Sequence, residues 1–304
     1  MNPRLAQPSM TRGRVLTAKT ADLVSLVKPR IMVMALLTAA GAMSLAPGIL
    51  PFAQSLWLLA GTALIVGSAN TLNMWLERDV DCLMSRTKNR ALPGGRLHAN
   101  SALVFGALQG FVALPVLAVT GMIPAALGLL ALILYVGAYT PMKQRSHWAV
   151  WLGAVPGAMP ALMGWTAATG RIDLPGLAVF GVLFIWQVPH THAIGVYRQR
   201  EYDAAGLKTL PGTHGVASAR RQILAFLVVQ VAISFAPAYL GVAGLPYLIA
   251  ASVLGVMVLV QAFGTRVSAD TAKGDASRWA RNVFLASLIY LPILFAVMVA
   301  SGKH

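Results

Sequence analysis

Residues 73–95 read NMWLERDVDCLMSRTKNRALPGG and interrupt an otherwise apolar chain. Glu77, Asp79 and Asp81 are three of only nine acidic residues in 304, and they fall within five positions of one another. Several bases follow at once, and then a glycine pair. Because charge is costly in a bilayer and is kept there for function, this cluster beside a long apolar run predicts a polar site at a membrane edge.

The composition identifies the surrounding solvent as lipid. Hydrophobic residues make up 57% of the chain and charged residues 11%, and the mean hydropathy is +0.69. A soluble domain carries about 25% charged residues, so a large soluble α/β protein is excluded. The net charge of +15 could suggest nucleic acid as a partner, but the placement of the bases argues against one. Cys82 is the single cysteine, which excludes an intrachain disulfide and a cysteine metal cage.

Nine apolar runs have about the length needed to cross a hydrocarbon core about 30 Å thick. They cover residues 29–46, 55–77, 101–120, 122–140, 148–168, 175–197, 220–241, 244–264 and 282–300. The runs predict an all-α polytopic membrane protein with nine transmembrane helices. Residues 25–304 are expected to form one integral-membrane domain behind a cytoplasmic N-terminal tail, residues 1–24.

The bases predict the orientation of these spans. With the N-terminus in the cytoplasm, all 24 bases except Arg171 and Lys303 fall on the cytoplasmic side, as the positive-inside rule requires. All acidic residues except Asp173 fall there too. We therefore expect the chemistry at the cytoplasmic face of a bacterial cytoplasmic (inner) membrane.

The opening stretch has the spacing of a helical stripe. If the second span continues as a helix, Asn73, Glu77 and Asp81 follow one another at four-residue steps on one face, while Asp79 points elsewhere. Oxygen ligands of this kind suit Mg²⁺, which takes one or two carboxylates and shares the phosphate oxygens of a substrate. Bases that can bind phosphate follow directly, and they are Arg86, Lys88 and Arg90. The stretch therefore predicts a site for a metal-bridged diphosphate.

A second polar patch lies at the end of the sixth span. His190, Tyr197 and Glu201 share one stripe of a continuous helix, with Arg198 beside it and Lys208 in the following loop. His192 falls off the stripe, and we interpret it as a packing histidine.

These residues resemble a known family. NMWLERDVDCLMSRTKNR is similar to the NxxxDxxxD signature of the UbiA superfamily of intramembrane prenyltransferases. Within it, LVKPRIMVM (26–34), YTPMKQRS (139–146) and WQVPHTHAIGVYRQREYDAAG (186–206) resemble the protohaem IX farnesyltransferases, or haem O synthases. The resemblance covers about residues 20–295. Glu77 stands where the signature usually has Asp, which keeps the charge and lengthens the side chain.

The resemblance implies an activity and a set of roles. Such enzymes transfer a farnesyl group from farnesyl diphosphate to a vinyl group of haem b, with Mg²⁺ as cofactor, in a UbiA-type helix bundle. The implied catalytic and metal residues are Asn73, Glu77, Asp81 and Glu201. The implied substrate-binding residues are Lys28, Arg86, Lys88, Arg90, Lys143, His190, Tyr197, Arg198 and Lys208. The implied partners are the two substrates, the lipid bilayer, and haem A synthase or a terminal-oxidase assembly, with no nucleic acid.

Three other readings remain open from the residues. A quinone precursor or another aromatic acceptor would use the same first motif. A secondary transporter could have nine spans, although transporters place their sites near the midplane and often carry inverted repeats. A haem-binding scaffold without catalysis would have no use for the acidic stripe.

Overall fold

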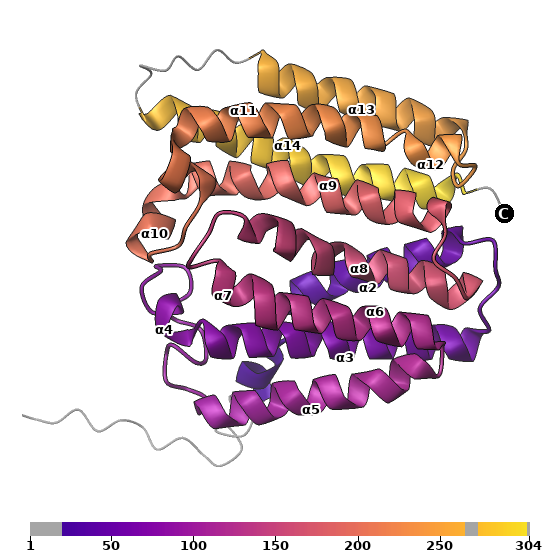
Figure 1. The fold of residues 1–304 in the computed structure, drawn as a ribbon, viewed down its shortest axis with the longest axis horizontal. Helices are drawn as coiled ribbons and strands as arrows, with labels where there is room; N and C mark the ends of the chain where they lie inside the picture. The colour runs from indigo at the N-terminus through magenta and orange to yellow at the C-terminus, as the bar shows by residue number, and fades with distance from the viewer. Residues whose placement is uncertain (1–19, 265–272, 303–304) are drawn as a thin grey trace, which may run out of the picture.

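The computed structural model describes residues 20–264 and 273–302, and the described chain is a bundle of helices that run side by side (Figure 1). Most of the expected N-terminal tail lies outside the described residues. The long helices are α2 (Pro29–Leu45), α3 (Phe52–Leu76), α5 (Ala99–Ala118), α6 (Met122–Ile133), α8 (Ala149–Thr169), α9 (Leu174–Tyr197), α11 (Leu210–Ile233), α13 (Leu245–Phe263) and α14 (Lys273–Ala300). The short ones are α4 (Arg78–Asp81), η1 (Leu134–Tyr139), α7 (Thr140–Met142), α10 (Gln199–Ala204) and α12 (Ala236–Tyr239).

Each of the nine expected spans coincides with one long helix of the described chain, so the prediction of an all-α membrane protein is confirmed. Seven helical segments are long and apolar enough to cross a membrane. An eighth is added if the helix Thr20–Leu26 and α2, bent by 51° at their junction, count as one broken span. The remaining long helix, α8, is not among these candidate spans, and it contains Pro156 and Pro160. It is also packed among α2, α6 and α9, so neighbouring helices rather than lipid cover much of it.

Two helices begin earlier than the apolar pattern indicates. The pattern places the start of the seventh span at 220 and of the ninth at 282, but α11 begins at Leu210 and α14 at Lys273. Both early stretches are polar or charged, and hydropathy detects only the part of a helix that faces lipid. The early part of α11 also contains a kink at Gly215, where φ is 80°.

Six inner elements enclose the centre of the bundle: α2, α3, α6 with η1, α8, α9 and α14. Helix α5 packs outside α3, while α11 and α13 cover α9 and α14 (Figure 1). Small residues allow close approach, as is usual between membrane helices. A side chain at Gly164 of α8 would collide with the Ala39 carbonyl of α2.

The fourth span changes its winding before it reaches the membrane edge. The α-helix α6 passes into the π-helix η1, and Pro141 follows in α7. Proline lacks the N–H of a regular helical turn and crowds the carbonyl four residues before it. The Thr140 N–H accordingly bonds to the Tyr135 carbonyl, five residues back. Tyr135 and Tyr139, which belong to this wider turn, line the same cavity as residues of α4 and α10.

Candidate active site

A polar cavity of about 260 Å³ lies at the end of the bundle that carries α4, α7 and α10. We call it the mouth. Its charged lining residues are Lys28, Glu77, Asp81, Arg86, Arg90, Lys143 and Lys208. Asn73, three tyrosines, two histidines and two threonines complete its polar lining. The mouth therefore gathers residues from four separate connections of the chain, which precede α2 or join α3 to α5, α6 to α8 and α9 to α11.

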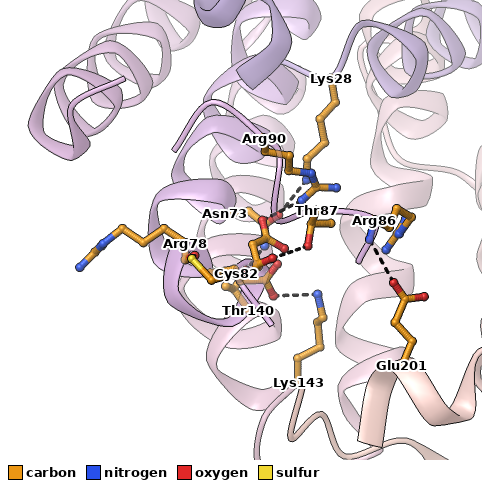
Figure 2. Close-up of polar contacts among 12 residues, drawn as sticks. Lys28, Asn73, Arg78, Cys82, Arg86, Thr87, Arg90, Thr140, Lys143 and Glu201 are labelled. Atoms are coloured by element: carbon orange, nitrogen blue, oxygen red, sulfur yellow. Dashed lines mark hydrogen bonds and ion pairs between the residues drawn. The ribbon is translucent and has the colours of Figure 1, made fainter. Parts of the chain in front are cut away.

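Each of the two buried carboxylates of the mouth is paired with a base. Glu77 is 6% exposed and accepts a hydrogen bond of 2.7 Å from Lys143 Nζ. Asp81 is 4% exposed and accepts one of 2.8 Å from Arg90 Nη1 (Figure 2). Because a buried charge is costly without a partner, each pair supplies the partner that its acid needs and holds its base at the cavity.

Asn73 is held from both sides. Its Oδ1 accepts a bond of 2.8 Å from Lys28 Nζ, and its Nδ2 donates one of 3.1 Å to Thr140 Oγ1. Lys28 is the one non-glycine residue of the described chain with a positive φ, at 51°. An L-residue adopts this conformation at a cost, so the surrounding fold fixes the backbone where the Lys28 side chain enters the mouth.

The expected stripe is present, although the helix is not continuous. Helix α3 ends at Leu76 and α4 follows, with Glu77 between them. The Glu77 N–H bonds to the Asn73 carbonyl and the Asp81 N–H to the Glu77 carbonyl, so the four-residue spacing survives the break. All three side chains line the mouth, whereas the Asp79 side chain is 84% exposed and points away, as expected.

The second expected stripe is not formed, because α9 ends at Tyr197 and the backbone turns at Arg198. His190 Nδ1 lies 2.7 Å from Ser287 Oγ, and its ring stacks on Trp186. Tyr197 packs against the apolar core of the bundle. Neither residue lines the mouth.

Glu201 connects two loops instead of lining the cavity. It accepts bonds of 3.2 Å from Ser85 Oγ and 3.4 Å from the Arg86 N–H, and one of 3.0 Å from Arg198 Nη1. Figure 2 shows it beside Arg86, apart from Asn73 of the first motif. Burial tends to raise the pKa of Glu201, but the hydrogen bonds from Arg198, Arg86 and Ser85 outweigh it and lower that pKa. The contact joins α10 to the loop after α4.

Of the other expected substrate-binding residues, Lys208 lines the mouth, whereas Lys88 is exposed and does not. The sequence interpretation missed Tyr135, Tyr139, His147, His192 and Tyr202, which also line it. Pro141, which follows Tyr135 and Tyr139 in the stretch YVGAYTP, could have indicated an irregular helical turn. His192 does lie off the side of α9 that carries His190, as expected, but it lines the mouth, which its interpretation as a packing histidine missed. A helical wheel gives angles within a helix and not which face meets a cavity.

The mouth adjoins a larger apolar cavity of about 520 Å³, which we call the chamber. Ile31 and Tyr135 line both cavities, so they mark the junction. The chamber is enclosed by the six inner elements, and its lining is almost entirely apolar. Met34 of α2 and Leu288 of α14 line it and are about half-exposed, so the chamber is open at the seam between these two helices.

The mouth contains suitable oxygen donors for a hard divalent cation. Asn73, Glu77 and Asp81 offer an amide oxygen and two carboxylates at one wall. No three acidic, histidine or cysteine side chains converge into a closed metal site within residues 20–264 and 273–302.

A membrane-embedded helix bundle with paired acids and bases beside an apolar chamber belongs to the class of enzymes that act on lipid-like substrates with a charged head. The sequence comparison specifies the family: residues 34–299 match the UbiA prenyltransferase family, and the chain belongs to it.

Relatives with a stated activity cover nearly the whole chain. The protoheme IX farnesyltransferase of an Anaeromyxobacter species is 45% identical, over 93% of this chain and 94% of that protein. The protoheme IX farnesyltransferase of Myxococcus xanthus is 44% identical, over 94% and 96% respectively.

Solved structures share the fold. A digeranylgeranylglyceryl phosphate synthase superposes with a TM-score of 0.77, at 14% identity, over 93% of this chain and 99% of that one. A UbiA homologue from Archaeoglobus fulgidus, bound to DMAPP and Mg²⁺, gives 0.63 at 16% identity, over 91% and 99%.

Proposed function

We propose that this chain is a protohaem IX farnesyltransferase that converts haem b to haem O. It would transfer the farnesyl group of farnesyl diphosphate to a haem vinyl group, add water and release diphosphate. The observation that carries the proposal is the junction of a base-rich mouth with an apolar chamber. The choice of haem as acceptor rests on the 44–45% identity to the relatives named above.

The two cavities match the two ends of a prenyl diphosphate. The diphosphate would lie in the mouth against Lys28, Arg90, Lys143 and Lys208, with Arg86 at the rim. The farnesyl chain would fill the chamber, whose volume lies within the range of about 300–1,000 Å³ typical of ligand sites. The reacting C1 atom then falls at the junction beside Ile31 and Tyr135.

The reaction breaks the bond between C1 and the diphosphate oxygen, and the diphosphate leaves with the electron pair. C1 bonds to the terminal vinyl carbon, and water adds to the other vinyl carbon with loss of a proton. Lys28, Arg90 and Lys143 stabilise charge on the departing oxygens, and they are held in place beforehand. The chamber wall keeps competing water from the allylic cation. Asn73, Glu77 and Asp81 would hold Mg²⁺, which when bound neutralises further leaving-group charge.

The proposal includes a location. The described chain is an integral membrane protein, and the mouth lies at the end where bases concentrate. We infer that this end faces the cytoplasm of a bacterial inner membrane, in line with the positive-inside rule.

Purified protein in detergent or vesicles, given haem b, farnesyl diphosphate and Mg²⁺, should yield diphosphate and a farnesyl adduct of haem carrying one added water, as detected by mass. Turnover of a phenolic quinone precursor with haem untouched would instead make it a prenyltransferase with another acceptor. Uptake of a solute into vesicles without release of diphosphate would indicate a transporter.

A further inference from the structure

Two histidines line the wall of the mouth, and neither has a part in holding diphosphate. His192 comes from α9 and His147 from the connection before α8. His192 is only 3% exposed, and its Nε2 has no hydrogen-bond partner among the described residues. Because a buried polar atom without a partner costs about 1–3 kcal/mol, the orphan nitrogen is best explained by a partner that arrives with the substrates.

The other groups of the mouth are poorly suited to accept a proton. Lys28, Arg90 and Lys143 each donate a hydrogen bond to a side chain of the acidic stripe, and together with Lys208 they are the bases that would hold the diphosphate. Glu77 and Asp81 are each held by a base, and both would be occupied by the metal and the diphosphate. A neutral imidazole that carries its hydrogen on Nδ1 can accept a proton at Nε2, and the Nε2 of His192 has no partner among the described residues.

His147 begins a route by which a proton can reach the surface of the protein. The rings of His147 and His214 lie with centroids 4.6 Å apart, and His214 is exposed. Burial and the neighbouring His214 lower the pKa of His147, which favours its neutral form. A neutral imidazole can pass a proton on by accepting at one nitrogen and donating at the other.

We propose that His192 is the general base for the water that is added during haem O formation, and that His147 and His214 carry its proton to the aqueous side. This inference rests on the proposed function. After C1 has bonded to the terminal vinyl carbon, the positive charge lies on the vinyl carbon next to the porphyrin ring. The water oxygen bonds to that carbon while Nε2 takes one hydrogen of the water. His192 then passes a proton on and is restored.

The location agrees with this role. The diphosphate in the mouth fixes C1 near the Ile31–Tyr135 junction, and the vinyl group must meet it there. The water has to reach that same point from the mouth, because the chamber behind it is apolar. His192 lies on the wall of the mouth and not on that of the chamber.

The cation can also react without water, so the ratio of its two products tests the inference. If no base delivers water, the cation loses a C–H proton and gives an alkene that is lighter than haem O by one water. His192→Gln keeps polarity but removes the base. Single-turnover reactions with enzyme in excess, in H₂¹⁸O, should show the ratio of hydrated to dehydrated farnesyl product falling at least about 10-fold, while diphosphate release stays within about threefold. His147→Gln should lower the ratio less, and His98→Gln, at an exposed position, should leave it unchanged.

An unchanged ratio in His192→Gln would overturn the inference, whether or not total turnover falls. So would a variant that releases no diphosphate and makes no product, since His192 would then be needed before water enters. Failure of the wild-type protein to farnesylate haem at all would count against the proposed function and not against this step.

Discussion

At the residue scale, residues of the same charge that are near neighbours in the sequence differ in whether they line the mouth. Asp81 is 4% exposed and paired with Arg90, while the Asp79 side chain, two positions earlier, is 84% exposed. Arg90 lines the cavity and Lys88 does not. These neighbours form matched pairs for mutagenesis, because the two residues of each pair have the same charge and lie two positions apart in the chain.

Asp81→Asn should reduce the kcat/KM for farnesyl diphosphate by about 100-fold or more, because the neutral amide cannot balance Arg90 or bind a divalent cation strongly. Asp79→Asn should stay within twofold of the parent. The measurement is haem O formation by mass, with membrane insertion checked by detergent extraction and gel filtration. Equal activity of Asp81→Asn and Asp79→Asn would contradict the assignment of the acidic stripe.

Arg90→Gln should cost about 10- to 100-fold in kcat/KM, since it removes a base from the mouth and leaves Asp81 buried without its partner. Lys88→Gln should have little effect, although the sequence placed both bases in one phosphate site. Diphosphate release measured over a range of farnesyl diphosphate concentrations distinguishes the two. A larger loss in Lys88→Gln would show that the loop closes differently on substrate.

The spacing of Asn73, Glu77 and Asp81 could be predicted because it depends on contacts within one stretch of chain. The roles of Tyr135 and His192 could not be predicted in this way. Tyr135 is turned by the π-helical winding before Pro141, and His192 faces the mouth only because α9 packs against α8, α11 and α14 on its other sides. The position of His192 depends on packing between segments far apart in sequence, whereas that of Tyr135 depends on a local change of winding that the apolar pattern does not mark.

At the element scale, contacts between helices leave little tolerance at specific glycines. Gly164→Ala should lower the stability by about 2 kcal/mol or more, because the new Cβ would collide with the Ala39 carbonyl and force α2 and α8 apart. Gly181→Ala on α9 is the matched control, since its Cβ would meet Ile233 at an ordinary 3.6 Å. Thermal unfolding in detergent should show a clear fall in Tm for the first variant and none for the second.

The contact of Glu201 with Ser85, Arg86 and Arg198 closes α10 onto the loop after α4. Because the folded pKa of Glu201 lies below its ordinary value of 4.5, the contact contributes stability above pH 4.5 and loses it as the pH falls through the lowered pKa. Hydrogen exchange of residues 82–88 should therefore quicken in acid. Glu201→Gln should show fast exchange already at pH 7 and a smaller loss of activity than Asp81→Asn. Unchanged exchange in Glu201→Gln would show that the contact does not hold the loop.

The sequence predicted the apolar parts of the helices, but it did not predict the polar parts that extend past them. Hydropathy located all nine long helices but missed the first ten residues of α11 and the charged start of α14. It also could not show that α9 stops at Tyr197, because nothing in the apolar pattern marks the turn at Arg198.

At the scale of the whole molecule, the volume of the chamber should select the length of the prenyl chain. Ala69 of α3 lines the chamber, and Ala69→Phe should shift the preference from farnesyl toward geranyl diphosphate by about 10-fold in the ratio of kcat/KM values. Ala60→Phe, on the exposed side of the same helix, should leave the ratio unchanged. No shift with Ala69→Phe would place the prenyl chain elsewhere.

The seam between α2 and α14, where Met34 and Leu288 line the chamber and are half-exposed, has a kinetic consequence. A substrate that enters there comes from the bilayer. The reaction rate therefore depends on its mole fraction among the lipids and not on its concentration in the whole solution. Diluting vesicles in buffer should then leave the rate per enzyme unchanged, whereas adding inert lipid at a fixed amount of enzyme and substrate should slow it in proportion.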